Sequence, residues 1–135
     1  MTNAIQFLDS VKSMPFMLLP VRSPVLTLSK ATILISPGSG LENKDFQAIN
    51  TLTDIVAPSL FHDGGIRKAS KIFPNALFWA APGLAQKKQD IPWTAEINAT
   101  TWIYDNELKA ILIEGMPKVN EVVFVHHVLM ASEIR

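Results

Sequence analysis

The apolar residues of this chain are gathered into short runs, and this spacing is the strongest constraint on its fold. Runs at residues 25–28, 32–35, 54–57 and 76–80 are rich in aliphatic, β-branched and aromatic side chains. They are too short for helices of ordinary length, so we predict that each is a strand. The first two are nearly continuous rather than alternating, which is typical of strands covered on both faces.

Helical spacing separates these runs. Asn43 is a candidate N-cap for a helix whose inner stripe is Phe46, Ile49 and Leu52. Within residues 61–73, apolar or small residues recur at positions 66, 69, 70 and 73, with basic residues on the other side. Strands that alternate with helices at this spacing predict an α/β layered domain.

The two ends of the chain carry weaker patterns. Thr2 or Asn3 followed by Gln6 resembles a capping box, and apolar residues at positions 5, 8 and 11 predict a short leading helix. A short helical turn is expected after Pro82-Gly83, and residues 90–105 are expected to be a loop with extended pieces. Residues 110–113 and 122–128 complete the predicted strands.

Composition limits the class of protein. A chain of 135 residues is expected to form a single domain over residues 1–135. Twelve Lys and Arg balance twelve Asp and Glu, which argues against a nucleic-acid partner. No apolar stretch approaches the roughly 18 residues that span a bilayer, and cysteine is absent. We expect a cytoplasmic protein with no membrane partner, whose apolar-rich surface favours self-association.

Few residues are candidates for chemistry. His62 and Asp63 follow the predicted strand at 54–57, where α/β sheets bind ligands, although Asp63 is more commonly a helix cap in such a place. His126 and His127 are neighbours on a strand, so their side chains point to opposite faces and suit a structural role better than a shared metal.

Two further features allow more than one interpretation. Asn120 and Glu121 precede the last strand and either line a site or form a turn, with equal weight. Trp79, Trp93 and Trp102 are expected to anchor the core and loops rather than to cage a cofactor.

Four segments stand out in order along the chain: Leu-Pro-Val-Arg with Val-Leu-Thr-Leu at residues 19–28, Ile-Val-Ala-Pro-Ser-Leu-Phe-His at 55–62, Phe-Pro-Asn-Ala through Ala-Pro-Gly-Leu at 73–84, and Gly-Met-Pro through Asn-Glu-Val-Val-Phe at 115–124. Taken together, they resemble a largely uncharacterised bacterial and plant family related to the metallo-β-lactamase fold. The resemblance implies two mixed β-sheets stacked face to face with helices outside, an αββα sandwich. Since the family's chains continue beyond the position matched by Arg135, we expect an incomplete, C-terminally short version of that sandwich.

The resemblance also implies a degenerate metal motif. Pro58 and Leu60 fall where the wider superfamily has its first two metal-binding histidines, His62 falls on its aspartate, and Asp63 on its last histidine of that motif. Met116 falls near the next metal histidine, and a thioether is a poor ligand for a hydrolytic metal. We therefore expect no metal and no cofactor.

The sequence is compatible with three interpretations of function. The first is a non-catalytic binding or scaffolding protein whose apolar sheet face is covered by a second copy. The alternative is a hydrolase-like enzyme with an altered site, in which His62 is the general base and lies with Asp63, Asn120 and Glu121 around one pocket. A third reading, an inactive remnant, predicts poor solubility.

Overall fold

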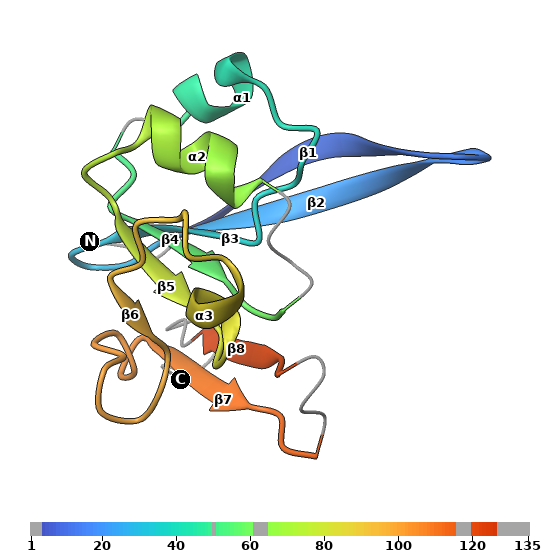
Figure 1. The fold of residues 1–135 in the computed structure, drawn as a ribbon. Coiled ribbons are helices and arrows are strands. Elements are labelled where there is room, and N and C mark those ends of the chain that lie inside the picture. The colour runs from blue at the N-terminus through green and yellow to red at the C-terminus, as the bar shows by residue number, and fades with distance from the viewer. Residues whose placement is uncertain (1–3, 50, 61–64, 116–119, 127–135) are drawn as a thin grey trace, which may run out of the picture.

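A computed structural model describes residues 4–49, 51–60, 65–115 and 120–126 of the chain. Its main element is a six-stranded mixed sheet with the strand order β1-β2-β3-β4-β5-β6, and a two-stranded sheet, β7-β8, forms another layer (Figure 1). The six strands are β1 (Ala4–Met14), β2 (Met17–Thr27), β3 (Thr32–Ile35), β4 (Asp54–Ala57), β5 (Leu77–Ala80) and β6 (Ala95–Glu96). The second sheet consists of β7 (Leu108–Leu112) and β8 (Val122–His126).

The first two strands form a long hairpin, which corrects the predicted leading helix. β1 and β2 pair antiparallel from Ala4↔Thr27 to Met14↔Met17, so only Pro15 and Phe16 lie in the turn. Beyond the part that packs on the body, this hairpin projects as a two-stranded arm (Figure 1). The apolar residues at positions 5, 8 and 11 do not share one face, because alternate residues of a strand point to opposite sides.

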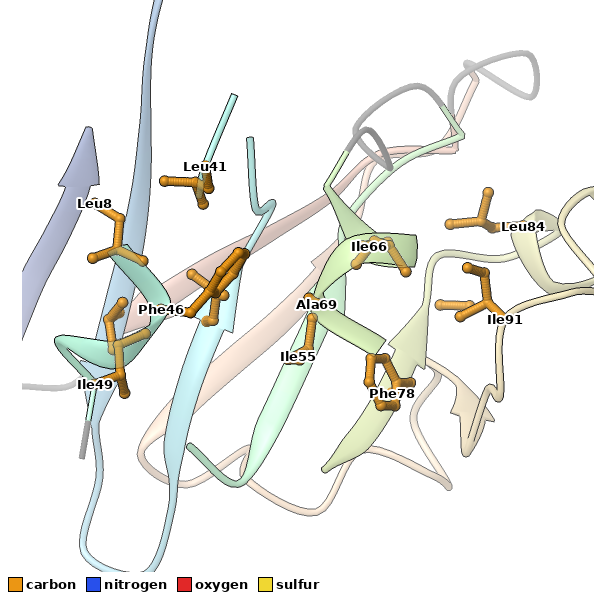
Figure 2. Packing of buried hydrophobic residues seen from close by; sticks show 14 residues of the cluster. Leu8, Leu41, Phe46, Ile49, Ile55, Ile66, Ala69, Phe78, Leu84 and Ile91 are labelled. Carbon is orange, nitrogen blue, oxygen red and sulfur yellow. The ribbon is translucent and has the colours of Figure 1, made fainter. Parts of the chain in front are cut away.

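The centre of the sheet is covered on both faces, as the near-continuous apolar runs predicted. β3 and β4 have the predicted bounds, and β3, β4, β5 and β6 run parallel. Their side chains alternate between two cores: Leu34, Ile55 and Phe78 lie on one side, shown in Figure 2, while Ile33 and Trp79 lie on the other. The buried backbone N–H and C=O groups of these strands are hydrogen-bonded to the neighbouring strands.

Three short helices cover one face of the sheet. They are α1 (Asn43–Gln47), α2 (Ile66–Ile72) and α3 (Leu84–Lys87). Phe46 and Ile66 point from α1 and α2 into the first core (Figure 2). The predicted cap of α1 is wrong by one residue: Glu42 is the N-cap and forms a reciprocal capping box with Asp45. The expected helix at 61–73 is observed over Ile66–Ile72, and residues 61–64 lie outside the described part of the chain.

The second sheet covers the opposite face through aromatic side chains. Trp79 of β5 and Trp102, in the loop before β7, meet edge to face with ring centroids 5.0 Å apart. Trp102 also contacts Phe124 of β8, at 5.4 Å, and its Nε1 donates to the carbonyl of Leu108. Trp79 and Trp102 are almost fully buried, which confirms that they are core residues. The layers are therefore helices, large sheet and small sheet, an α/β architecture.

A buried carboxylate joins these layers at the start of β4. Asp54 is fully buried, and its two oxygens accept hydrogen bonds from Trp79 Nε1 at 2.8 Å and from the Tyr104 hydroxyl at 2.9 Å. The hydroxyl of the neighbouring Thr53 also donates to it. Because a buried charge is costly unless donors surround it, these contacts fix the loop that carries Tyr104 against the sheet.

Replacing Tyr104 with Phe removes one donor from this carboxylate while keeping the ring. We expect Tyr104→Phe to lower the free energy of unfolding by about 1.5–3 kcal/mol at neutral pH, the usual value for a hydrogen bond to a charged group. Urea denaturation followed by tryptophan fluorescence measures this difference. An unchanged midpoint and slope would show that the Asp54 contact with Tyr104 contributes nothing.

The same pair gives a pH dependence. Burial, and next the hydrogen bond to Asp54, raise the pKa of the Tyr104 hydroxyl well above its ordinary value. A raised pKa in the folded state stabilises the fold fully below the unfolded pKa of about 10, and that stabilisation declines as the pH rises above it. The stability difference between the wild type and Tyr104→Phe should therefore shrink above pH ~10. Tyr104 is the chain's only tyrosine, so its ionisation can be followed by absorbance at alkaline pH in the same samples.

Candidate functional site

The carboxyl ends of the parallel strands meet at one edge of the large sheet. β3, β4 and β5 end there and continue into segments rich in proline and glycine, at residues 36–40, 58–60 and 81–83. In open α/β sheets, ligands bind outside the carboxyl ends of the strands. This edge is therefore the first place to look for a site.

The start of β8 is tied to this edge by two hydrogen bonds. The backbone N–H of Val122 donates to the carbonyl of Pro58, at 2.7 Å, and the side-chain amide of Asn120 donates to the carbonyl of Pro82, at 2.9 Å. Asn120 has a φ of 46°, in the left-handed region that asparagine tolerates better than most residues. The small sheet is thus attached directly to the ends of β4 and β5.

The four predicted site residues have different outcomes. Asn120 and Glu121 lie at this edge, and the carbonyl of Glu121 accepts a hydrogen bond from the N–H of Ile113 in the strand-to-strand connection. These contacts hold the start of β8 against the strand ends, and the two alternatives for Asn120 and Glu121, a site and a turn, both stay predictions. His62 and Asp63 lie outside the described residues, so a convergence of all four stays a prediction.

Beside the same edge lies a cavity of about 650 Å³ between β6, the loop that follows it and β7. We call it the β6–β7 groove. Its apolar lining includes Ile97, Trp102, Ile111, Leu112 and Val122, and its polar lining includes Glu96, Asn98, Asp105, Lys109 and Glu114. Sequence reasoning missed this site, because residues 90–105 show no clear period and its carboxylates are scattered among loop and strand positions.

Two of the acidic groups in the groove are held by backbone donors. Glu96 Oε1 accepts from the N–H of Gly83 at 3.0 Å, and Asp105 Oδ1 accepts from the N–H of Ala110 at 3.2 Å. Such contacts fix the direction of each carboxylate before any ligand arrives. With three acidic side chains and one lysine around an apolar floor, the groove is suited to a compact molecule that has an apolar body and a basic group.

The described donors at the strand ends do not fit a hydrolytic metal centre. Such zinc sites use three protein ligands from histidine, cysteine or carboxylate side chains. Pro58 and Leu60 have no such groups, and the backbone carbonyl of Pro58 is occupied by Val122. Among the described residues, no group of three or more His, Cys, Asp or Glu side chains is placed to hold a metal ion.

Comparison with solved structures identifies the fold. A metallo-beta-lactamase from Pontibacter korlensis superposes with a TM-score of 0.67 at 15% sequence identity, over 90% of this chain and 62% of its own. The DIM-1 metallo-beta-lactamase exposed to ceftazidime gives a TM-score of 0.69 at 12% identity, over 90% and 61%. No protein-family model and no curated protein sequence matches the chain.

The chain therefore has the metallo-β-lactamase fold, as the sequence resemblance implied. It spans about three fifths of the length of each of these two structures. Sequence identities of 12% and 15% show the fold alone, so membership of the uncharacterised family stays a prediction. In the described part of the chain, no helix is long and apolar enough to cross a membrane.

Two substitutions test how much the hydrogen bond from Asn120 to the Pro82 carbonyl contributes to folding stability. Asn120→Gly keeps access to a positive φ but loses the amide donor, and we expect it to cost about 1 kcal/mol of folding stability. Asn120→Ala loses the donor and also strains the backbone, adding roughly 1 kcal/mol more. Chemical denaturation of both variants measures the two contributions separately. Equal stability of the alanine and glycine variants would contradict the left-handed conformation at this residue.

Proposed function

We propose that this protein acts by binding rather than by metal-dependent hydrolysis, and that its ligand lies in the β6–β7 groove. The observation that carries the proposal is the groove itself. It lies beside the ligand-binding edge of the sheet, has the volume of a small-molecule site, and combines an apolar floor with a few fixed polar groups.

The residues at the strand ends support a non-hydrolytic role. The sequence resemblance implies that the first two metal-binding histidines of the wider superfamily fall after β4, where this chain has Pro58 and Leu60. Pro58 and Pro82 instead give their carbonyls to Val122 and Asn120, which attach the second sheet. We propose that Pro58 and Pro82 have a structural role. We also propose that the metal motif is degenerate, as expected from the sequence.

The charges of the groove suggest the class of ligand. Glu96, Asp105 and Glu114 outnumber Lys109, so a basic group would be attracted, and the Trp102 indole with its aliphatic neighbours would receive an apolar body. The proposed ligand is therefore a small organic amine with an apolar part. A cytoplasmic location, with which the sequence is compatible, is part of this proposal.

Two dansyl probes with one fluorophore and opposite charge test the proposal. Dansylcadaverine has a free amine and dansylglycine a carboxylate, and fluorescence anisotropy measures the binding of each. We expect the amine to bind more tightly. The double variant Asp105→Asn, Glu114→Gln should weaken amine binding about three- to tenfold, since each exposed charge contributes less than about 1 kcal/mol.

The control is Asp90→Asn, which removes a carboxylate elsewhere on the surface, where Asp90 pairs with Arg67. It should leave both probes unaffected. In the double variant, the Asp105→Asn substitution keeps a side-chain oxygen that can accept from the Ala110 N–H, so the loop is preserved. Equal affinity of the two probes, or an equal loss in the control variant, would contradict the proposed ligand class.

A further inference from the structure

One face of the β1–β2 arm continues the inner face of the large sheet without any cover from the described residues. The register pairs Ile5 with Leu26, and it pairs Leu26 with Ile33. Leu26 and Ile33 both belong to the core beneath the small sheet. Every second residue outward along β1 and β2 lies on this same face. There Phe7 is 47% exposed and Leu18 is 69% exposed.

We propose that a second copy of this chain packs against this inner arm face, which we define as Ile5, Phe7, Asp9, Val11, Leu18, Pro20 and Arg22. The proposal gives a surface to the self-association expected from composition, and it is independent of the ligand proposed for the β6–β7 groove. Its four large apolar side chains, Ile5, Phe7, Val11 and Leu18, are each about half or more exposed. Exposed apolar side chains gathered on one face, here on both sides of the Asp9 and Arg22 pair, are typical of an interaction site.

The charges on this face are complementary to themselves. Asp9 and Arg22 are directly opposite in the strand register, and Arg22 Nε donates to Asp9 Oδ1 at 2.9 Å. A two-fold axis that runs along the arm between the two strands would place each Asp9 over the partner's Arg22. Arg22 Cζ also lies over the ring of Phe7, 5.0 Å from its centroid, so the guanidinium is held close to the apolar surface.

The size of the face matches what a dimer needs. Eleven residues per strand give a ribbon roughly 35 Å long and about 10 Å wide. Two such faces in contact would bury on the order of 1,000 Å² in total, about the lower limit for a specific interface. Symmetric dimers use the same patch on both copies, and a self-complementary patch is what the Asp9 and Arg22 arrangement provides.

The opposite face of the arm also has exposed apolar residues, Met14, Met17 and Leu19, but it lacks a pair of opposite charges in register. Close to the body it is covered, with Leu8 and Val25 in the first core. Further out it has Lys12 directly opposite Leu19, so a charge without a register partner of opposite sign interrupts its apolar surface. Leu18 and Leu19 are therefore adjacent residues of the same type on opposite faces of one arm.

This pair of leucines provides a matched test. Sedimentation equilibrium of the full chain should show a dimer for the wild type at micromolar concentration. Leu18→Gln should raise the dissociation constant at least tenfold, and Leu19→Gln should change it less than twofold. Far-ultraviolet circular dichroism of both variants checks that the fold is kept.

Charge reversal provides a second test. Asp9→Arg leaves only positive charge at the centre of the face, and Arg22→Asp leaves only negative charge, so each variant alone should be monomeric. Because the intrachain pair is exposed, its loss should cost little stability. An equimolar mixture should form a heterodimer, which a purely intrachain role for the Asp9 and Arg22 pair does not predict.

Three results would overturn the proposal. The first is a wild-type monomer at 100 µM or above. The second is an equal effect of Leu18→Gln and Leu19→Gln on the dissociation constant. If the wild type then also binds anionic phosphatidylserine vesicles, the arm binds a lipid surface instead. The third is a mixture of the two charge-reversed variants that stays monomeric.

Discussion

The buried carboxylate of Asp54 is the constraint on which the layered structure most depends. It stands at the start of β4, at the centre of the large sheet, and its donors come from β5 and from the loop before β7. Trp79 and Tyr104 are also partners in the aromatic cluster that fills the space between the two sheets. One charged group thus specifies how two layers, otherwise held by non-directional apolar contacts, are placed relative to each other.

The sequence pattern predicted those elements whose structure depends mainly on neighbouring residues in the chain. The bounds of β3 and β4 could be predicted because each is a short run rich in aliphatic residues, too short for a helix of ordinary length. The first 14 residues could not, because β1 is held by eleven pairings with β2 and its own residues have no decisive period. Pro20 lies within β2 at a position where β1 is the only paired strand, so its missing N–H leaves no gap between two neighbouring strands.

The candidate site, like the fold, was predictable only in part from the sequence. The ends of parallel strands are predictable as a place where ligands bind, which is why His62 and Asp63 were singled out after β4, and that site stays a prediction. What happens there was not predictable, because the contacts that matter are made by backbone carbonyls to Val122 and Asn120, some forty to sixty residues away. The β6–β7 groove is equally hidden, since it arises from how β7 lies beside the loop after β6 rather than from any motif.

Both proposals follow from how unequal the two sheets are. Six strands present an inner face much wider than the two strands of β7 and β8 can cover. Where the small sheet does cover it, the interior is closed by aromatic residues and the margin beside β7 leaves the groove. Where it does not, the inner face continues along the arm as exposed apolar residues around the Asp9 and Arg22 pair. Exposed apolar surface of that kind is typical of an interaction site, and its self-complementary charges are the reason we propose a second copy as the partner.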